Sequence, residues 1–198
     1  MVNKELQERR MRDYFIQATR EILKGEGLRS VSVRHIAEKA GYSYATMYNY
    51  FKDAKELIFE CVQDFQDECE TLIQGETQGL PRGPEKIRAI TKAYIKYFIQ
   101  YPGIFELFFL ERMSELGHKQ PLNESIVIFL DRLCEEEWNY CIGQNLLKPD
   151  EAELKKTVLR DVVVGLLLFY LNRNYPQSYA DFQVLTDQKL DFILNRSR

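Results

Sequence analysis

The sequence predicts an all-α protein, and three observations support this fold class. Only 10 Gly and 6 Pro occur among 198 residues, so helix-breaking residues are scarce. Apolar residues recur at intervals of three and four, which is the period of an amphipathic helix, and no strand pattern competes. Hydrophobic residues make up 45% and charged residues 29%, as in a globular chain of one domain or two small ones. We expect about nine helices.

The first helices follow from an apolar stripe and from capping residues. The stripe of the first helix has spacings of four, three and four residues: Met11, Phe15, Ala18 and Ile22. Gly25 and Gly27 are expected to end this helix. Ser32 can cap a second helix of about two turns. Gly41 then supplies the αL conformation that a sharp turn needs.

A third short helix is expected after the cap residue Ser43, with Met47 and Phe51 pointing inward. The other side chains are expected to face outward, with Tyr48 at the side: Tyr44, Thr46, Asn49 and Tyr50. The segment DAKE at residues 53–56 has the pattern of a capping box and opens a connecting helix over residues 53–74. We expect one domain over residues 1–52 and a second over residues 53–198.

Five more helices are expected in the C-terminal part. Breaking residues concentrate in GETQGLPRGP, and helical patterns follow it at about 84–100, 102–116, 122–144, 150–174 and 178–195. The segment DEAE at residues 150–153 reads as a second capping box. The helix over 150–174 contains VLRDVVVGLLLFYL, which is apolar on nearly every face and must be covered on all sides.

Charge and cysteine usage bound the class of protein. Residues 1–60 carry 11 Lys and Arg against 9 Asp and Glu, whereas the rest of the chain carries 16 against 21. This mild asymmetry is compatible with an N-terminal part that binds nucleic acid, but it does not establish one. The four cysteines lie far apart, and no signal-peptide or membrane-length apolar run occurs, so we expect a cytoplasmic protein with reduced thiols.

Two short helices that flank a glycine turn have the spacing of a helix-turn-helix, whose second helix enters the DNA major groove. Outward hydroxyl and amide groups suit phosphates and base edges. The detailed pattern, GLRSVSVRHIAEKAGYSYATMYNYFKDAKEL, resembles the TetR (tetracycline repressor) family of bacterial transcriptional regulators. The similarity runs from about Arg12 to Leu57, and the departures from it are Tyr42, Ala45 and Ala54.

The resemblance implies which residues contact DNA. It assigns Ser32, Tyr48 and Lys55 to phosphates, and it implies that four residues lie nearest the bases: Tyr44, Ala45, Thr46 and Asn49. Ser43 and Tyr50 complete the expected DNA-binding set. Lys55 in the first turn of a helix opposes the helix macrodipole, an effect that a facing phosphate would offset. The structural alternative is a solvated Lys55 and a Tyr48 that is half-buried against the second helix.

For the C-terminal helices, the resemblance implies a ligand pocket and a dimer interface. Five rings are the candidates for the pocket: Phe98, Phe105, Phe109, Trp138 and Tyr170. Their abundance favours a small apolar or aromatic effector, although rings at helical spacing also serve as core. We expect a homodimer through the helices near 150–174 and 178–195, with Gly165 allowing close approach. A two-fold dimer predicts a palindromic operator.

The function that follows is a ligand-responsive DNA-binding regulator, a repressor released from its operator by the effector. The alternative is a DNA-binding protein of the same fold whose C-terminal part docks a protein partner. An enzyme is not expected, because the two histidines, His35 and His118, have no Cys or carboxylate at metal-ligand spacing. No nucleophile elbow or glycine-rich phosphate loop occurs. No cofactor or metal is expected.

Overall fold

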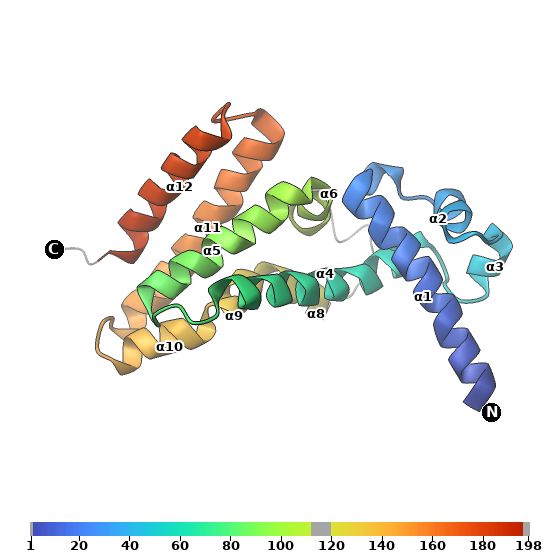
Figure 1. The fold of residues 1–198 in the computed structure, drawn as a ribbon, viewed down its shortest axis with the longest axis horizontal. Coiled ribbons are helices and arrows are strands. Elements are labelled where there is room, and N and C mark those ends of the chain that lie inside the picture. Colours follow the sequence, from blue (N-terminus) through green and yellow to red (C-terminus); the bar gives the residue numbers. More distant parts are fainter. Residues whose placement is uncertain (1, 112–119, 196–198) are drawn as a thin grey trace. The chain divides into compact units, whose positions relative to one another are not determined.

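The computed structural model describes residues 2–111 and 120–195, and all regular elements within these ranges are helices (Figure 1). The all-α prediction is therefore confirmed. Contacts divide the chain into two compact units. We call Met1–Glu68 with Tyr101–Asn123 the N-terminal unit, and Cys69–Gln100 with Glu124–Arg198 the C-terminal unit. The division into domains 1–52 and 53–198 stays a prediction.

The N-terminal unit is built around the core that the sequence predicts. Its helices are α1 (Val2–Gly25), α2 (Val33–Ala40), α3 (Tyr44–Tyr48), the first part of α4 (Ala54–Thr77) and α6 (Pro102–Phe105). The stripe of α1 packs with residues of α2, α3 and α4 in one buried cluster: Phe15, Ala18, Ile22, Ile36, Met47, Phe51 and Leu57. Met11 packs against this cluster and is partly buried.

The predicted caps fix the ends of the short helices. The Ser32 hydroxyl accepts a hydrogen bond from the His35 N–H at 3.2 Å, and the Ser43 hydroxyl accepts one from the Thr46 N–H at 3.1 Å. Gly41 between the two helices has a φ of 77°, the αL conformation that L side chains rarely adopt. These predictions are confirmed. The third helix is shorter than expected, since α3 ends at Tyr48.

The start of α4 carries a variant of the predicted capping box. The Asp53 carboxylate accepts a hydrogen bond from the Glu56 N–H at 2.9 Å, as expected of a cap residue. The Glu56 carboxylate reaches back to the N–H of Lys52 at 2.8 Å. The reciprocal bonds therefore tie the turn after α3 to the first turn of α4.

Three departures from the sequence expectation occur: one after Tyr101 in the N-terminal unit and two in the C-terminal unit. After the end of α4, the C-terminal unit contains α5 (Pro84–Gln100), α8 (Gln120–Val127), α9 (Phe129–Leu133), α10 (Glu135–Gly143), α11 (Pro149–Arg173) and α12 (Tyr179–Leu194). The first residues of α8, up to Asn123, belong to the N-terminal unit. The single helix expected over 122–144 is broken at Ile128 and Cys134. No side-chain bond caps the N-terminus of α11, so residues 150–153 form no capping box. The helix expected over 102–116 changes to a π-helical turn over Glu106–Leu110, and residues 112–116 lie outside the described ranges.

Helix α5 is the central helix of the C-terminal unit, because it packs against α9, α10, α11 and α12 (Figure 1). A part-buried ion pair connects α9 and α11. Arg160 of α11 donates to Asp131 of α9 at 2.6 Å, and the Asp131 side chain is almost completely buried. None of the described helices is long and apolar enough to span a membrane.

Candidate functional site

The helix-turn-helix presents a polar face to solvent because its apolar residues are buried in the core. Met47 is fully buried and Phe51 is 2% exposed, so the opposite side of α3 faces solvent. Tyr44 is 60% exposed and Tyr48 is 53% exposed. Other residues of the predicted DNA-binding set are also exposed: Ser32, Ser43, Ala45, Asn49 and Lys55. Thr46 is half-buried, and its hydroxyl lies 2.8 Å from that of Ser43.

Tyr50 does not face outward as the sequence analysis expected. It is half-buried, and its ring packs against the core, with its centroid 6.3 Å from that of Phe15. Its carbonyl oxygen accepts a hydrogen bond of 2.7 Å from Arg12, whose guanidinium lies 4.2 Å above the Phe51 ring. The reason is that α3 ends at Tyr48, so the turn after it directs Tyr50 back toward α1.

Tyr48 and Lys55 also have definite surroundings. Tyr48 is exposed, so it is not half-buried against the second helix as the structural alternative expected. Lys55 is exposed in the first turn of α4, where the resemblance implies a phosphate contact. The expected DNA-binding set does not include Tyr42, which directly precedes the cap residue Ser43. Its ring is 38% exposed and lies 6.0 Å from the Tyr14 ring.

His35 makes structural contacts. The ring Nδ1 of His35 lies 3.0 Å from the carbonyl oxygen of Ser30, which gives the imidazole a structural partner. His118 lies outside the described residues. Among the residues that the structure describes, no group of three or more His, Cys, Asp or Glu side chains could hold a metal ion.

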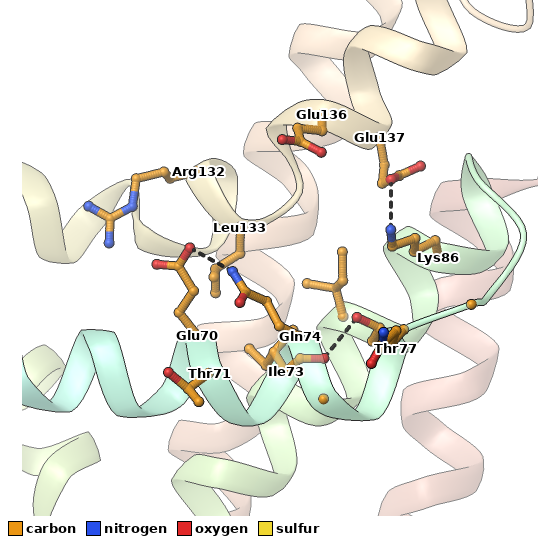
Figure 2. Close-up of a pocket in the computed structure, with 14 residues that line it drawn as sticks. Glu70, Thr71, Ile73, Gln74, Thr77, Lys86, Arg132, Leu133, Glu136 and Glu137 are labelled. Atoms are coloured by element: carbon orange, nitrogen blue, oxygen red, sulfur yellow. Dashed lines mark hydrogen bonds and ion pairs between the residues drawn. The ribbon is translucent and has the colours of Figure 1, made fainter.

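The C-terminal unit contains a cavity of about 620 Å³, which is within the usual size range of small-molecule sites (Figure 2). Its walls come from the end of α4, the loop after it, the start of α5, and helices α9 and α10. Polar and charged side chains dominate the lining: Glu70, Thr71, Gln74, Thr77, Gln78, Lys86, Arg132, Glu136 and Glu137. Ile73, Ile90 and Leu133 are the apolar members.

Glu137 fixes one wall of this cavity. Its side chain is 2% exposed, and its carboxylate accepts a hydrogen bond of 2.8 Å from the backbone N–H of Gly83. Lys86 Nζ and Arg82 Nε each lie 3.3 Å from Oε1. Burial by itself would raise the pKa of Glu137, but the Gly83 N–H and the two cations hold it below the ordinary value. The loop before α5 is thereby anchored on α10.

The five rings predicted to bind a ligand lie elsewhere. Phe98 and Phe105 are fully buried, Trp138 is nearly so, and Phe109 and Tyr170 are half-buried. The rings of Phe105 and Phe109 lie 5.2 Å apart in the N-terminal unit, whereas the others belong to the C-terminal unit. None of the five lines the 620 Å³ cavity. The indole N–H of Trp138 is buried and has no hydrogen-bond partner among the described residues.

Sequence reasoning missed the cavity for a physical reason. Its lining consists of glutamines, threonines and charged residues that also occur on any solvated helix face. The cavity also depends on the separate helices α9 and α10, and no Gly or Pro marks the breaks at Ile128 and Cys134.

Comparison with known proteins gives a family for the N-terminal part. Residues 15–61 match the family of bacterial regulatory proteins described as the tetR family. This range covers the helix-turn-helix and the start of α4. No curated protein matches the chain.

Solved structures share the fold over almost the whole chain. A TetR family transcription regulator from Marinobacter aquaeolei VT8 is 18% identical with a TM-score of 0.63, covering 96% of this chain and 97% of that chain. The regulator FadR from Bacillus subtilis, in complex with stearoyl-CoA, is 17% identical with a TM-score of 0.72, covering 92% and 97%. RolR in complex with resorcinol is 13% identical with a TM-score of 0.69, covering 98% and 91%.

At these identities the solved structures establish the fold alone. The family is indicated by the match of residues 15–61. Both the shared fold and the family match agree with the exposed polar face of the capped helix-turn-helix. The N-terminal part of the chain, residues 15–61, belongs to the tetR family of bacterial regulatory proteins.

Proposed function

We propose that this protein is a homodimeric transcriptional repressor that binds a palindromic operator and is released by a small effector. The observation that carries the proposal is the exposed polar face of α3. Tyr44, Ala45 and Asn49 lie on this face, next to a fully buried Met47. A helix of this kind inserts into the major groove, and its hydroxyl and amide groups contact base edges and phosphates.

The apolar surface of α11 and α12 supports a dimer. Large side chains of these two helices are exposed in the single chain: Leu154, Val158, Phe169, Val184 and Phe192. Phe192 is 86% exposed, an extent that is unfavourable for a phenylalanine in water. A second copy of the chain would cover these residues. Two recognition helices in a two-fold dimer are typically about 34 to 36 Å apart, so they fit successive major grooves.

The 620 Å³ cavity is the proposed effector site. Its lining favours a polar effector over the apolar or aromatic one expected from sequence, because charged and amide groups need hydrogen-bonding partners. FadR and RolR were solved with stearoyl-CoA and resorcinol, and these neighbours support a small-molecule effector for this chain. Ligand contacts by the five predicted rings stay a prediction.

Helix α4 offers a physical route from effector to DNA. Its first turns carry Lys55 and the core residue Leu57, and its last turns carry Ile73 and Gln74 of the cavity wall. An effector that prefers a shifted α4 would change the placement of the helix-turn-helix. Coupling of about 1 to 3 kcal/mol between the two sites is typical of allosteric proteins.

A cavity-filling variant tests the switch. Polar metabolites are screened for their ability to release the purified protein from its operator, and any that act are tested on Gln74→Trp. This variant should bind operator but lose the response. Gln63→Trp is the matched control, because Gln63 is exposed on the same helix and does not line the cavity. An effector that acts equally on both variants would contradict the assignment of the cavity.

A further inference from the structure

Tyr14 and Tyr42 form an exposed aromatic pair beside the recognition helix. Their ring centroids lie 6.0 Å apart, and the Tyr42 ring also packs against Phe15 at 5.7 Å. Tyr14 is 54% exposed and Tyr42 is 38% exposed, so neither residue is buried in the core. The pair is placed by the turn at Gly41, since the Tyr42 N–H donates to the Ala37 carbonyl at 2.9 Å.

The tyrosine pair continues the face that α3 presents. Tyr42 is joined to the cap residue Ser43, and Tyr44 follows it with 60% exposure. The large apolar or aromatic side chains that are exposed in the described part of the N-terminal unit are few: Leu6, Tyr14, Tyr42, Tyr44, Tyr48 and Leu110. Four of these six are tyrosines of this one region. A tyrosine presents an apolar ring and a hydroxyl at once, which suits a partner with sugars and phosphates.

The face of α1 that contains Tyr14 is free of carboxylates near the pair. Gln7, Arg10, Tyr14 and Gln17 are spaced four or three residues apart and therefore share one face of the helix. Gln7 and Arg10 are both exposed. The next residue on this face, Glu21, lies 3.7 Å from Lys39.

Of the acidic residues in the first half of α1, Asp13 borders this face, because it lies three residues from Arg10 and four from Gln17, whereas Glu5 and Glu8 lie on other faces. Asp13 directly precedes Tyr14, so it lies about 100° around the helix from it. Glu8 follows Gln7 by one residue and is displaced by the same angle, and Glu5 lies two residues before Gln7. The face around Tyr14 is thus rich in hydrogen-bond donors, with the exposed Arg10 as its cation. Donors of this kind suit phosphate oxygens.

We propose that Arg10, Tyr14 and Tyr42 form a second DNA-contacting surface, which binds the sugar–phosphate backbone flanking the operator half-site. This inference rests on the proposed function. The tyrosine hydroxyls donate to phosphate oxygens, the rings pack on the deoxyribose, and Arg10 neutralises one phosphate. Such contacts add affinity and register without adding base preference.

The experiment compares two duplexes that carry the selected operator. One duplex extends beyond both half-sites, and the other is trimmed to the base pairs that the selection specifies. The full chain is tested as wild type, Tyr14→Phe, Tyr42→Phe and Arg10→Gln. Each Phe variant keeps the ring and removes one hydroxyl. The controls, Tyr175→Phe and Arg9→Gln, make the same changes at exposed positions outside the proposed surface, since Arg9 lies about 100° around α1 from Arg10.

On the long duplex we expect each Phe variant to bind about tenfold more weakly, the low end for a hydrogen bond to a charged group. Arg10→Gln should lower the slope of log affinity against log salt by about 1. On the trimmed duplex the variants should match wild type. Thermal unfolding of the Phe variants should be unchanged, because the ring packing is preserved.

Two results would overturn the inference: variants that bind the long duplex like wild type, or variants that are weakened equally on both duplexes. The first would show that the tyrosine pair contacts no DNA, and the second would place its contacts inside the half-site. If the wild-type chain selects no duplex at all, the proposed function fails, and the inference fails with it.

Discussion

Replacement of Gly103 by alanine should loosen the contact between α6 and α1. Gly103 is buried at the start of α6, where an added Cβ would lie 2.2 Å from the carbonyl oxygen of Leu23 and 2.8 Å from the Cα of Gly27. Both neighbours are backbone atoms, so no side-chain rotation can relieve the overlap. The Cβ to oxygen distance has to grow from 2.2 Å to at least 3.0 Å, which requires the two helices to separate.

Two opposing effects set the size of the loss. Overpacking that forces backbone shifts typically costs about 1 to 3 kcal/mol, and a clash with backbone on two sides belongs at the upper end of this range. Alanine gains about 1 kcal/mol over glycine within a helix. We therefore expect Gly103→Ala to lower the free energy of unfolding by about 2 kcal/mol. For a chain of this length the midpoint should fall by roughly 4 to 8 °C.

Thermal unfolding followed by circular dichroism measures this change. Gly75→Ala is the matched control, because Gly75 is also helical but an added Cβ there would meet nothing within 4 Å. The control should raise the midpoint, since only the helix-propensity gain remains. If Gly103→Ala is as stable as Gly75→Ala, the close approach of α6 to α1 is wrong.

Three further predictions concern stability, assembly and DNA binding. Glu137→Gln should cost about 1 to 3 kcal/mol at pH 7, because the Gly83 N–H and two cations lose their carboxylate partner. The pKa of Glu137 is lowered in the folded protein, so urea titrations should show this difference shrinking as the pH falls below about 4.5. Gly165→Ala meets open space in the single chain and should stabilise α11, but it should weaken the dimer in sedimentation if a partner helix packs there. Lys55→Ala should weaken binding to all sequences alike, whereas Asn49→Ala should change the selected bases.

The N-terminal unit could be predicted closely because local signals agree with tertiary packing. The caps at Ser32 and Ser43, the αL glycine and the apolar stripe of α1 all specify the same arrangement. Tyr50 was the exception. Its outward placement assumed one more turn of α3, and the hydrogen bond of its carbonyl to Arg12 comes from a residue 38 positions away.

The C-terminal unit was predictable in helix content and much less so in detail. The breaks in the segment over 122–144 have no local signal, and Arg160 bonded to Asp131 and Glu137 bonded to Gly83 hold the broken pieces through long-range contacts. The sequence could not assign a role to the aromatic residues for a similar reason. A ring is as suitable for the core as for a ligand, and only the packed structure distinguishes the two roles.

Selection of random duplex DNA by the purified protein tests the central claim most directly. The retained duplexes are sequenced at moderate salt, with the selection repeated on a Tyr44→Ala, Asn49→Ala double variant. We expect a palindrome whose half-sites are one helical turn apart for the wild type, and a changed or absent palindrome for the variant. Duplexes with no common sequence, or the same palindrome from both proteins, would contradict an operator reader built on α3.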